Sequence, residues 1–140
     1  MARILRATGL ALAAGVMVLA AGVAEAKPRL TGEQQLAKML EGRVAGEPVN
    51  CINNPTISSA RVIDKTAIVY DSGNTLYVQR PRTGVESLDD DAILVTRLYG
   101  SQLCSVDTVQ LVDRVSGFWR GFVGLDTFVP YTKVKVAAAK

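Results

Sequence analysis

The stretch TAIVYDSGNTLYVQ, residues 66–79, lies at the centre of the segment between Cys51 and Cys104 and decides the fold. Side chains in its two apolar runs alternate with a period of two residues, as they do in β-strands, where neighbours point to opposite faces. Residues 71–74 (Asp-Ser-Gly-Asn) separate the runs and tolerate the backbone angles of tight turns. The pattern predicts a β-hairpin that ends before Pro81, because proline donates no backbone hydrogen bond.

Strand-like sequence continues on both sides of this hairpin. The alternation starts at Ile57, and residues 93–98 and 109–114 also have the composition of strands. Residues 93–98 open with consecutive apolar side chains, which predicts a central strand buried on both faces. We therefore predict a mainly-β domain with one N-terminal helix and about five or six mostly antiparallel strands, forming a small sandwich or a partly open barrel. An α+β fold is the alternative.

A dense group of aromatic and aliphatic side chains occupies residues 118–129. Aromatic rings bury a large apolar area, so a cluster of rings is more typical of packing than of a ligand-binding shelf. We expect this group to form the core. Its members are Phe118, Trp119, Phe122, Val123, Leu125, Phe128 and Val129.

Cys51 and Cys104 are the two cysteines of the chain. An even number of thiols in a chain with an export signal predicts a disulfide bond, and the pair lacks the C-x-x-C spacing of redox sites. Closing a loop of about 54 residues stabilises a fold by about 4 kcal/mol on the loop-entropy model. Asp107, just after the bridge, is expected to accept backbone N–H bonds in a turn.

Residues 27–50 are expected to form a helix and a connector. Thr31 and Gln34 have the spacing of a capping box, and apolar residues recur on one face of the following turns, which predicts a helix at about 32–41. Residues 43–50 contain glycine and proline and no clear period. They are therefore expected to be a connector.

The first 26 residues have the features of a secretory signal peptide. Arg3 and Arg6 precede a long apolar run, and Ala24-Glu25-Ala26 forms a small-x-small cleavage site before Lys27. The run is rich in alanine and glycine, which makes it a weak membrane anchor. Cleavage between Ala26 and Lys27 is therefore favoured over an uncleaved anchor. It predicts a periplasmic or secreted protein with no stable membrane insertion after cleavage.

Composition restricts the classes of function. The chain has 16 basic and 13 acidic residues and no histidine. The lack of histidine excludes Ser-His-Asp and Cys-His catalysis and every His-ligated metal site. The small net charge and the scattered basic residues argue against nucleic acid as a partner. No catalytic residue and no cofactor is assigned from the sequence.

Asp89, Asp90 and Asp91 are the sharpest polar feature of the chain. Adjacent carboxylates suit Ca²⁺ chemically, but the spacing is not that of an EF-hand. A solvated loop that caps the next element is favoured, so the three aspartates are only a weak candidate for a metal site. The alternative function that uses them is a metal-assisted or carboxylate-based hydrolase, in which Asp107 would join them.

Several short motifs together resemble a family. Cys51 is followed by segments 63–64 and 68–70, then by Leu103-Cys104 with Asp107, then by L-x-x-F-V-P-Y at 125–131. This order resembles small exported proteobacterial proteins that carry a cysteine-bridged domain of unknown function. The resemblance covers roughly residues 51–133. It implies an exported, disulfide-bonded domain and assigns no functional residue.

Four segments follow from these observations: a signal peptide (1–26), a helix and connector (27–50), a disulfide-stapled β domain (51–133) and a frayed tail (134–140). The leading functional hypothesis is an exported non-enzymatic domain that binds another envelope component. The expected partner is a protein, as it is for small disulfide-stapled β inhibitors. The hydrolase is one alternative, and a structural protein anchored to the membrane by an uncleaved N-terminus is another. The sequence leaves the oligomeric state open.

Overall fold

The computed structural model describes residues 28–134. The predicted signal peptide, its cleavage site and nearly all of the predicted frayed tail lie outside the described residues. The described part contains one α-helix, two short 3-10 helices and ten strands. The elements are α1 (Gly32–Met39), β1 (Arg43–Ala45), β2 (Cys51–Asn53), η1 (Asn54–Thr56), β3 (Ser59–Ile63), β4 (Ala67–Ser72), β5 (Thr75–Gln79), η2 (Val85–Ser87), β6 (Ile93–Thr96), β7 (Gln102–Cys104), β8 (Thr108–Val112), β9 (Trp119–Gly124) and β10 (Phe128–Lys133).

The strands form three antiparallel sheets. A five-stranded sheet has the order β1-β10-β5-β4-β3, a three-stranded sheet the order β6-β8-β9, and β2 pairs with β7 in a two-stranded ribbon. The predicted mainly-β class with one helix and antiparallel strands is confirmed. The strands outnumber the predicted five or six. Most of the difference arises because β1, β2 and β7 are three residues long, too short to show a period in the sequence.

The predicted hairpin is confirmed as β4 and β5. The two strands pair from Ile68 opposite Gln79 to Ser72 opposite Thr75. Gly73 occupies the two-residue turn with a φ angle of 65°, a conformation that glycine adopts without steric cost. Local turn chemistry thus sets the register of two adjacent interior strands of the larger sheet.

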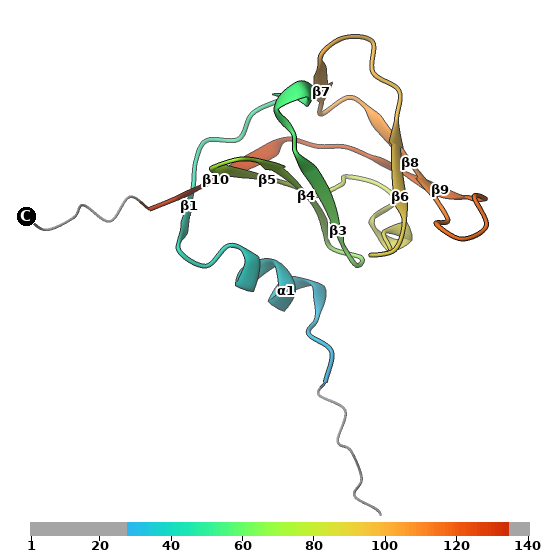
Figure 1. Cartoon of the computed structure of the whole chain (residues 1–140), viewed down its shortest axis with the longest axis horizontal. Helices are drawn as coiled ribbons and strands as arrows, with labels where there is room; N and C mark the ends of the chain where they lie inside the picture. The colour runs from blue at the N-terminus through green and yellow to red at the C-terminus, as the bar shows by residue number, and fades with distance from the viewer. Residues whose placement is uncertain (1–27, 135–140) are drawn as a thin grey trace, which may run out of the picture.

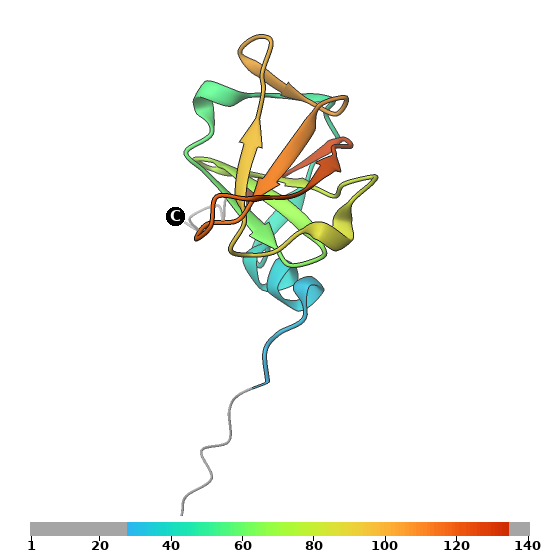
Figure 2. The ribbon, with the colours of Figure 1, turned by 90° about the vertical axis from the view of Figure 1, so that its right-hand side faces the viewer.

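The layers are a helix, the five-stranded sheet and the three-stranded sheet (Figure 1). A large apolar cluster lies between the two sheets and includes Tyr70, Leu111 and Phe128. A smaller cluster lies on the opposite face of the five-stranded sheet, where Leu36 of α1 packs near Ile63. Figure 2 shows the three-stranded sheet turned toward the viewer, in front of the other layers. Its inner side covers the core, which leaves its other side facing solvent.

The predicted capping box is present at the start of α1. The Thr31 hydroxyl accepts a bond from the Gln34 backbone N–H, and the Gln34 side chain accepts one from the Thr31 backbone N–H. The helix ends at Met39, slightly earlier than predicted. Within residues 28–134, no helix has the length and apolar character needed to span a membrane.

The predicted connector at 43–50 contains a short strand. Residues 43–45 form β1, which pairs with residues 131–133 of β10 at the edge of the five-stranded sheet. Val49 also bridges to Phe128. The sequence of this segment does not indicate the strand, because a three-residue edge strand depends on its partner, and that partner lies far away in the sequence.

The disulfide bond between Cys51 and Cys104 is present. The two cysteines lie directly opposite each other in the ribbon formed by β2 and β7. The Asp107 carboxylate accepts the Cys104 backbone N–H at 2.7 Å, as predicted. The bridge therefore sits on a hydrogen-bonded ribbon that joins the start of the β segment to its middle.

Tyr70 and Gln79 bring polar groups into the core. Both side chains are buried, and neither the Tyr70 hydroxyl nor the Gln79 amide has a hydrogen-bond partner within the described residues. Burial raises the pKa of Tyr70 far above its usual range. The phenol is therefore neutral at physiological pH.

Candidate binding surface

The aromatic segment divides into a buried half and an exposed half. Val123, Leu125 and Phe128 are fully buried, as the sequence predicted. The prediction is wrong for Phe118, Trp119 and Phe122, whose side chains are 75%, 63% and 53% exposed. The physical reason is that β9 belongs to the outer layer, where one face of each strand contacts the core and the other faces solvent.

A β-bulge places both exposed rings of β9 on the same face. Leu111 pairs with Gly121 and Val112 pairs with Trp119, so Arg120 is an extra residue in β9. Without the bulge, Trp119 and Phe122 would point to opposite faces, because they lie three positions apart. With it they stack on each other, with ring centroids 6.5 Å apart and an interplanar angle of 26°.

Two cross-strand rows extend this aromatic pair over the sheet. One row runs from Ile93 through Val112 to Trp119, and the other from Val95 through Gln110 to Phe122. Ile93 and Val95 are 40% and 44% exposed. We call the solvent-facing side of these two rows the outer face. It is apolar except for Gln110.

β6 lies at the edge of the three-stranded sheet. The sequence predicted a central strand buried on both faces for residues 93–98, and that prediction is wrong. Leu94 packs partly against the core, while Ile93 and Val95 point outward. Unbroken apolar sequence has two explanations, burial on both faces or an apolar solvent face, and periodicity does not separate them.

Loops at both ends of the outer face add further apolar side chains. Tyr99 and Val106 are 93% and 75% exposed, and together with Val95 and Gln110 they line a hollow of about 640 Å³. Val115, 94% exposed, lies in the turn between β8 and β9. Within the described residues, eight of the twelve exposed large apolar side chains belong to this sheet or to its flanking loops. Such a concentration is unusual on a protein surface that contacts only water.

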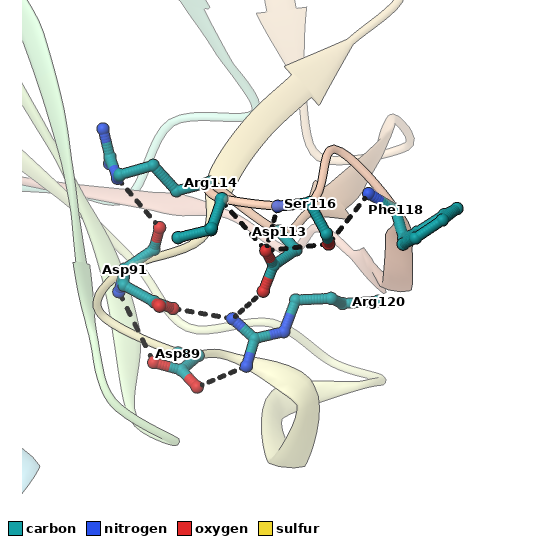
Figure 3. Close-up of polar contacts among 8 residues, drawn as sticks. Asp89, Asp91, Asp113, Arg114, Ser116, Phe118 and Arg120 are labelled. Atoms are coloured by element: carbon teal, nitrogen blue, oxygen red, sulfur yellow. Dashed lines mark hydrogen bonds and ion pairs between the residues drawn. The ribbon is translucent and has the colours of Figure 1, made fainter.

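The bulged Arg120 is held by three carboxylates (Figure 3). Its guanidinium lies 3.0 Å from Asp89, 2.6 Å from Asp91 and 3.5 Å from Asp113. The aspartates come from two segments, the loop before β6 and the end of β8. Because hydrogen bonds between charged groups are directional, these contacts orient the bulge on which the stacking of Trp119 and Phe122 depends.

Asp113 also organises the turn between β8 and β9. Asp113 accepts the Ser116 backbone N–H at 2.7 Å, its hydroxyl at 2.9 Å and the Val115 N–H at 3.0 Å. The Ser116 N–H is the main cause that lowers the pKa of Asp113, and the Asp91 backbone N–H is the main cause for Asp89. Pairing with Asp91 raises the pKa of Arg120. Asp89, Asp113 and Arg120 are therefore charged at neutral pH.

Glycine is required next to the bulge. Gly121 has a φ angle of 145°, which side chains rarely adopt. A Cβ atom there would also lie 3.3 Å from the Ser87 hydroxyl. The glycines of this segment, which show no regular spacing in the sequence, thus have a local structural role.

The weak metal candidate at Asp89, Asp90 and Asp91 has a different arrangement from a metal site. Two of the three carboxylates bind Arg120, and within residues 28–134 no group of three or more His, Cys, Asp or Glu side chains is placed to hold a metal. Asp107 does not lie near this loop. It precedes β8 whereas Asp113 follows it, and six residues of extended strand span about 20 Å.

Sequence reasoning missed the outer face and Arg120. The sequence does not distinguish Arg120 from the other scattered basic residues, because its three partners lie 7 to 31 positions away. One signal was available: the Gly-Phe-Val-Gly context of residues 121–124 breaks strict alternation, and an isolated glycine in a strand indicates a bulge.

Replacing Arg120 with methionine is expected to loosen the aromatic pair. The change leaves three carboxylates close together without their counter-charge, so the bulge loses its orientation. Trp119 is the single tryptophan of the chain, and its fluorescence anisotropy should fall in the variant. Arg80→Met, which removes an exposed ion pair with Glu33 elsewhere, should leave the anisotropy unchanged. Equal anisotropy in wild type and Arg120→Met would contradict this role.

Acid should destabilise the domain partly through Asp89 and Asp113. Both have lowered pKa values in the folded state, so the stability they contribute is complete above the unfolded pKa of about 4 and is lost as pH falls through the folded values. Urea midpoints should be flat from neutral pH to about 5 and decline below 4. Asp113→Asn should show a shallower decline, and parallel curves would count against the prediction.

Comparison of the chain with protein-family models, with curated proteins and with solved structures found no match.

Proposed function

We propose that the protein is an exported, non-enzymatic domain that binds a protein of the cell envelope on its outer face. The observation that carries the proposal is the stacked pair of Trp119 and Phe122 on an exposed sheet surface. Aromatic side chains, tryptophan above all, and arginine contribute much of the binding energy at protein interfaces. The predicted export signal and the disulfide bond agree with an oxidising compartment.

The chemistry of the face favours a protein partner with an apolar patch. Gln110 is the one polar side chain in the two cross-strand rows, so the centre offers apolar area and few hydrogen bonds. Arg97 and Asp107 lie at one margin, around the hollow under Tyr99. An apolar centre with a polar rim is the usual composition of a protein interface.

The carboxylates give less support to the hydrolase alternative. Asp89 and Asp91 form ion pairs with Arg120, and Asp107 lies at the other end of β8 and accepts the Cys104 N–H. Carboxylate-based hydrolysis needs two acids on either side of a bound substrate. Asp89, Asp91 and Asp113 instead bind the bulged Arg120, and Asp113 also accepts hydrogen bonds within a turn.

The test is capture with a variant that removes only the aromatic pair. The disulfide-intact protein is immobilised, an envelope extract of the producing cells is passed over it, and retained proteins are quantified by mass. Replacing Trp119 and Phe122 by serine should reduce retention of the dominant partner at least about thirtyfold, since the loss of one such ring alone is expected to cost about 2 kcal/mol.

A double variant on another surface provides the control. Val44 and Val49 are 57% and 37% exposed at the β1 edge, and replacing both by serine should leave retention unchanged. Equal urea midpoints for all three proteins would show that folding is not the cause. A partner retained equally by the Trp119/Phe122 variant would refute the proposed face, and retention of glycans instead of protein would refute the partner class.

A further inference from the structure

β6 lacks the protection that the other edge strands of the two larger sheets carry. β1 and β3 contain Arg43 and Arg61. β9 contains Arg120, and its edge is bridged at Gly124 by Thr83. β6 reads Ile-Leu-Val-Thr, with no charge and no proline. Edge strands are usually blocked by charge, proline or a covering segment, because their free backbone N–H and C=O groups recruit another strand.

Open space borders the free edge of β6. A groove of about 460 Å³ is lined by residues 60–62 of β3 on one side and by residues 92–94 on the other, with the charged Asp90 and Arg114 also on its wall. β3 and β6 are edges of two different layers that share one core (Figure 1). A strand added in the plane of the β6-β8-β9 sheet would lie along this groove.

Opposite charges flank β6. Asp89, Asp90 and Asp91 precede it, and Arg97 follows it directly. Neither Asp90 nor Arg97 forms an ion pair within residues 28–134. Because Asp89, Asp91 and Asp113 share the Arg120 guanidinium, the acidic end keeps excess negative charge. A strand with this pattern is complementary to a second, antiparallel copy of itself.

We infer that two copies of the chain form a homodimer through antiparallel pairing of their β6 strands, about a two-fold axis at Leu94. In this register Ile93 lies opposite Val95 of the second copy, which keeps both on the outer face. Arg97 lies opposite Asp91 of the second copy, next to its Asp90. The two outer faces join into one continuous surface with two aromatic pairs. This inference goes beyond the proposed function, since a monomer also presents an outer face.

Sedimentation equilibrium of the purified, disulfide-intact protein tests the dimer. Wild type is expected to show twice the monomer mass at high micromolar concentration. Val95→Lys places a charge in the paired edge and should raise the dissociation constant at least about a hundredfold. Val44→Lys makes the same change at the β1 edge, on a side chain that is also exposed, and should leave the dimer intact.

Charge reversal tests the register. Arg97→Glu brings like charges together at both symmetry-related contacts and should raise the dissociation constant of the dimer roughly tenfold. Adding Asp90→Arg in the same chain restores attraction and should recover most of the affinity. Asp90 is used because Asp91 also holds Arg120.

Three results would overturn the inference: a monomer at every concentration, a dimer that survives Val95→Lys, or a charge-reversed double variant weaker than Arg97→Glu alone. The outcome is independent of the capture experiment. A monomer that retains an envelope protein refutes the dimer alone, and a dimer that retains nothing refutes the proposed function alone.

Discussion

Replacing Cys51 and Cys104 by serine is expected to lower the free energy of unfolding by about 4 kcal/mol. The bridge joins residues that are 53 positions apart, so its loss releases a long loop in the unfolded chain. Domains of this size have about 5–15 kcal/mol of net stability in total. The variant should therefore be marginally folded at physiological temperature, which urea titration followed by far-UV circular dichroism measures directly.

Reduction provides an internal control for the serine variant. Wild type in excess reductant should unfold at the same urea concentration as the double variant, because both lack the same constraint. The ribbon of β2 and β7 is only three residue pairs long, so it has little stability without the covalent link. A loss below about 1 kcal/mol would show that the unfolded chain stays compact around this loop even without the bridge.

Replacing Phe128 by alanine is expected to cost about 3–5 kcal/mol. The side chain is fully buried between the sheets, and its ring meets the Tyr70 ring edge-to-face with centroids 5.9 Å apart. The truncation therefore removes apolar burial and an aromatic contact and leaves a cavity in a close-packed interior. Urea or thermal unfolding of the purified variant measures the loss.

Phe122 is the matched control for Phe128, because the two residues have the same chemistry and lie six positions apart. Its side chain is 53% exposed on the outer face, so Phe122→Ala should cost less than about 1 kcal/mol. Phe128→Ala should lower stability, whereas Phe122→Ala should lower partner retention with little loss of stability. Similar losses of stability in both variants would contradict the division of the aromatic segment into core and surface.

This division explains why the protein keeps costly apolar side chains on its surface. Trp119 and Phe122 do not fill the core, yet a bulge, a glycine at positive φ and three carboxylates around Arg120 all hold their strand in place. Features of this kind stabilise a particular local geometry more than the fold as a whole. Their convergence on two exposed rings supports a binding role for the outer face.

Local sequence was sufficient wherever neighbouring residues set the structure. The capping box of Thr31 and Gln34 predicted the helix, and the Gly73-containing turn predicted the central hairpin, because both depend on hydrogen bonds and backbone angles within a few residues. The pairing of Cys51 with Cys104 needed no geometry, since the chain has no other cysteine.

Only the tertiary structure decided which apolar residues are buried and which polar residues meet. Phe118, Trp119 and Phe122 have the same local pattern as core residues, and their exposure depends on β9 lying in the outer layer. β6 became an edge, and Asp89 and Asp91 met Arg120, through pairings across long stretches of chain. The hydrophobic effect has no direction, so sequence alone predicts that a residue prefers burial, and the order of the strands determines whether it is buried.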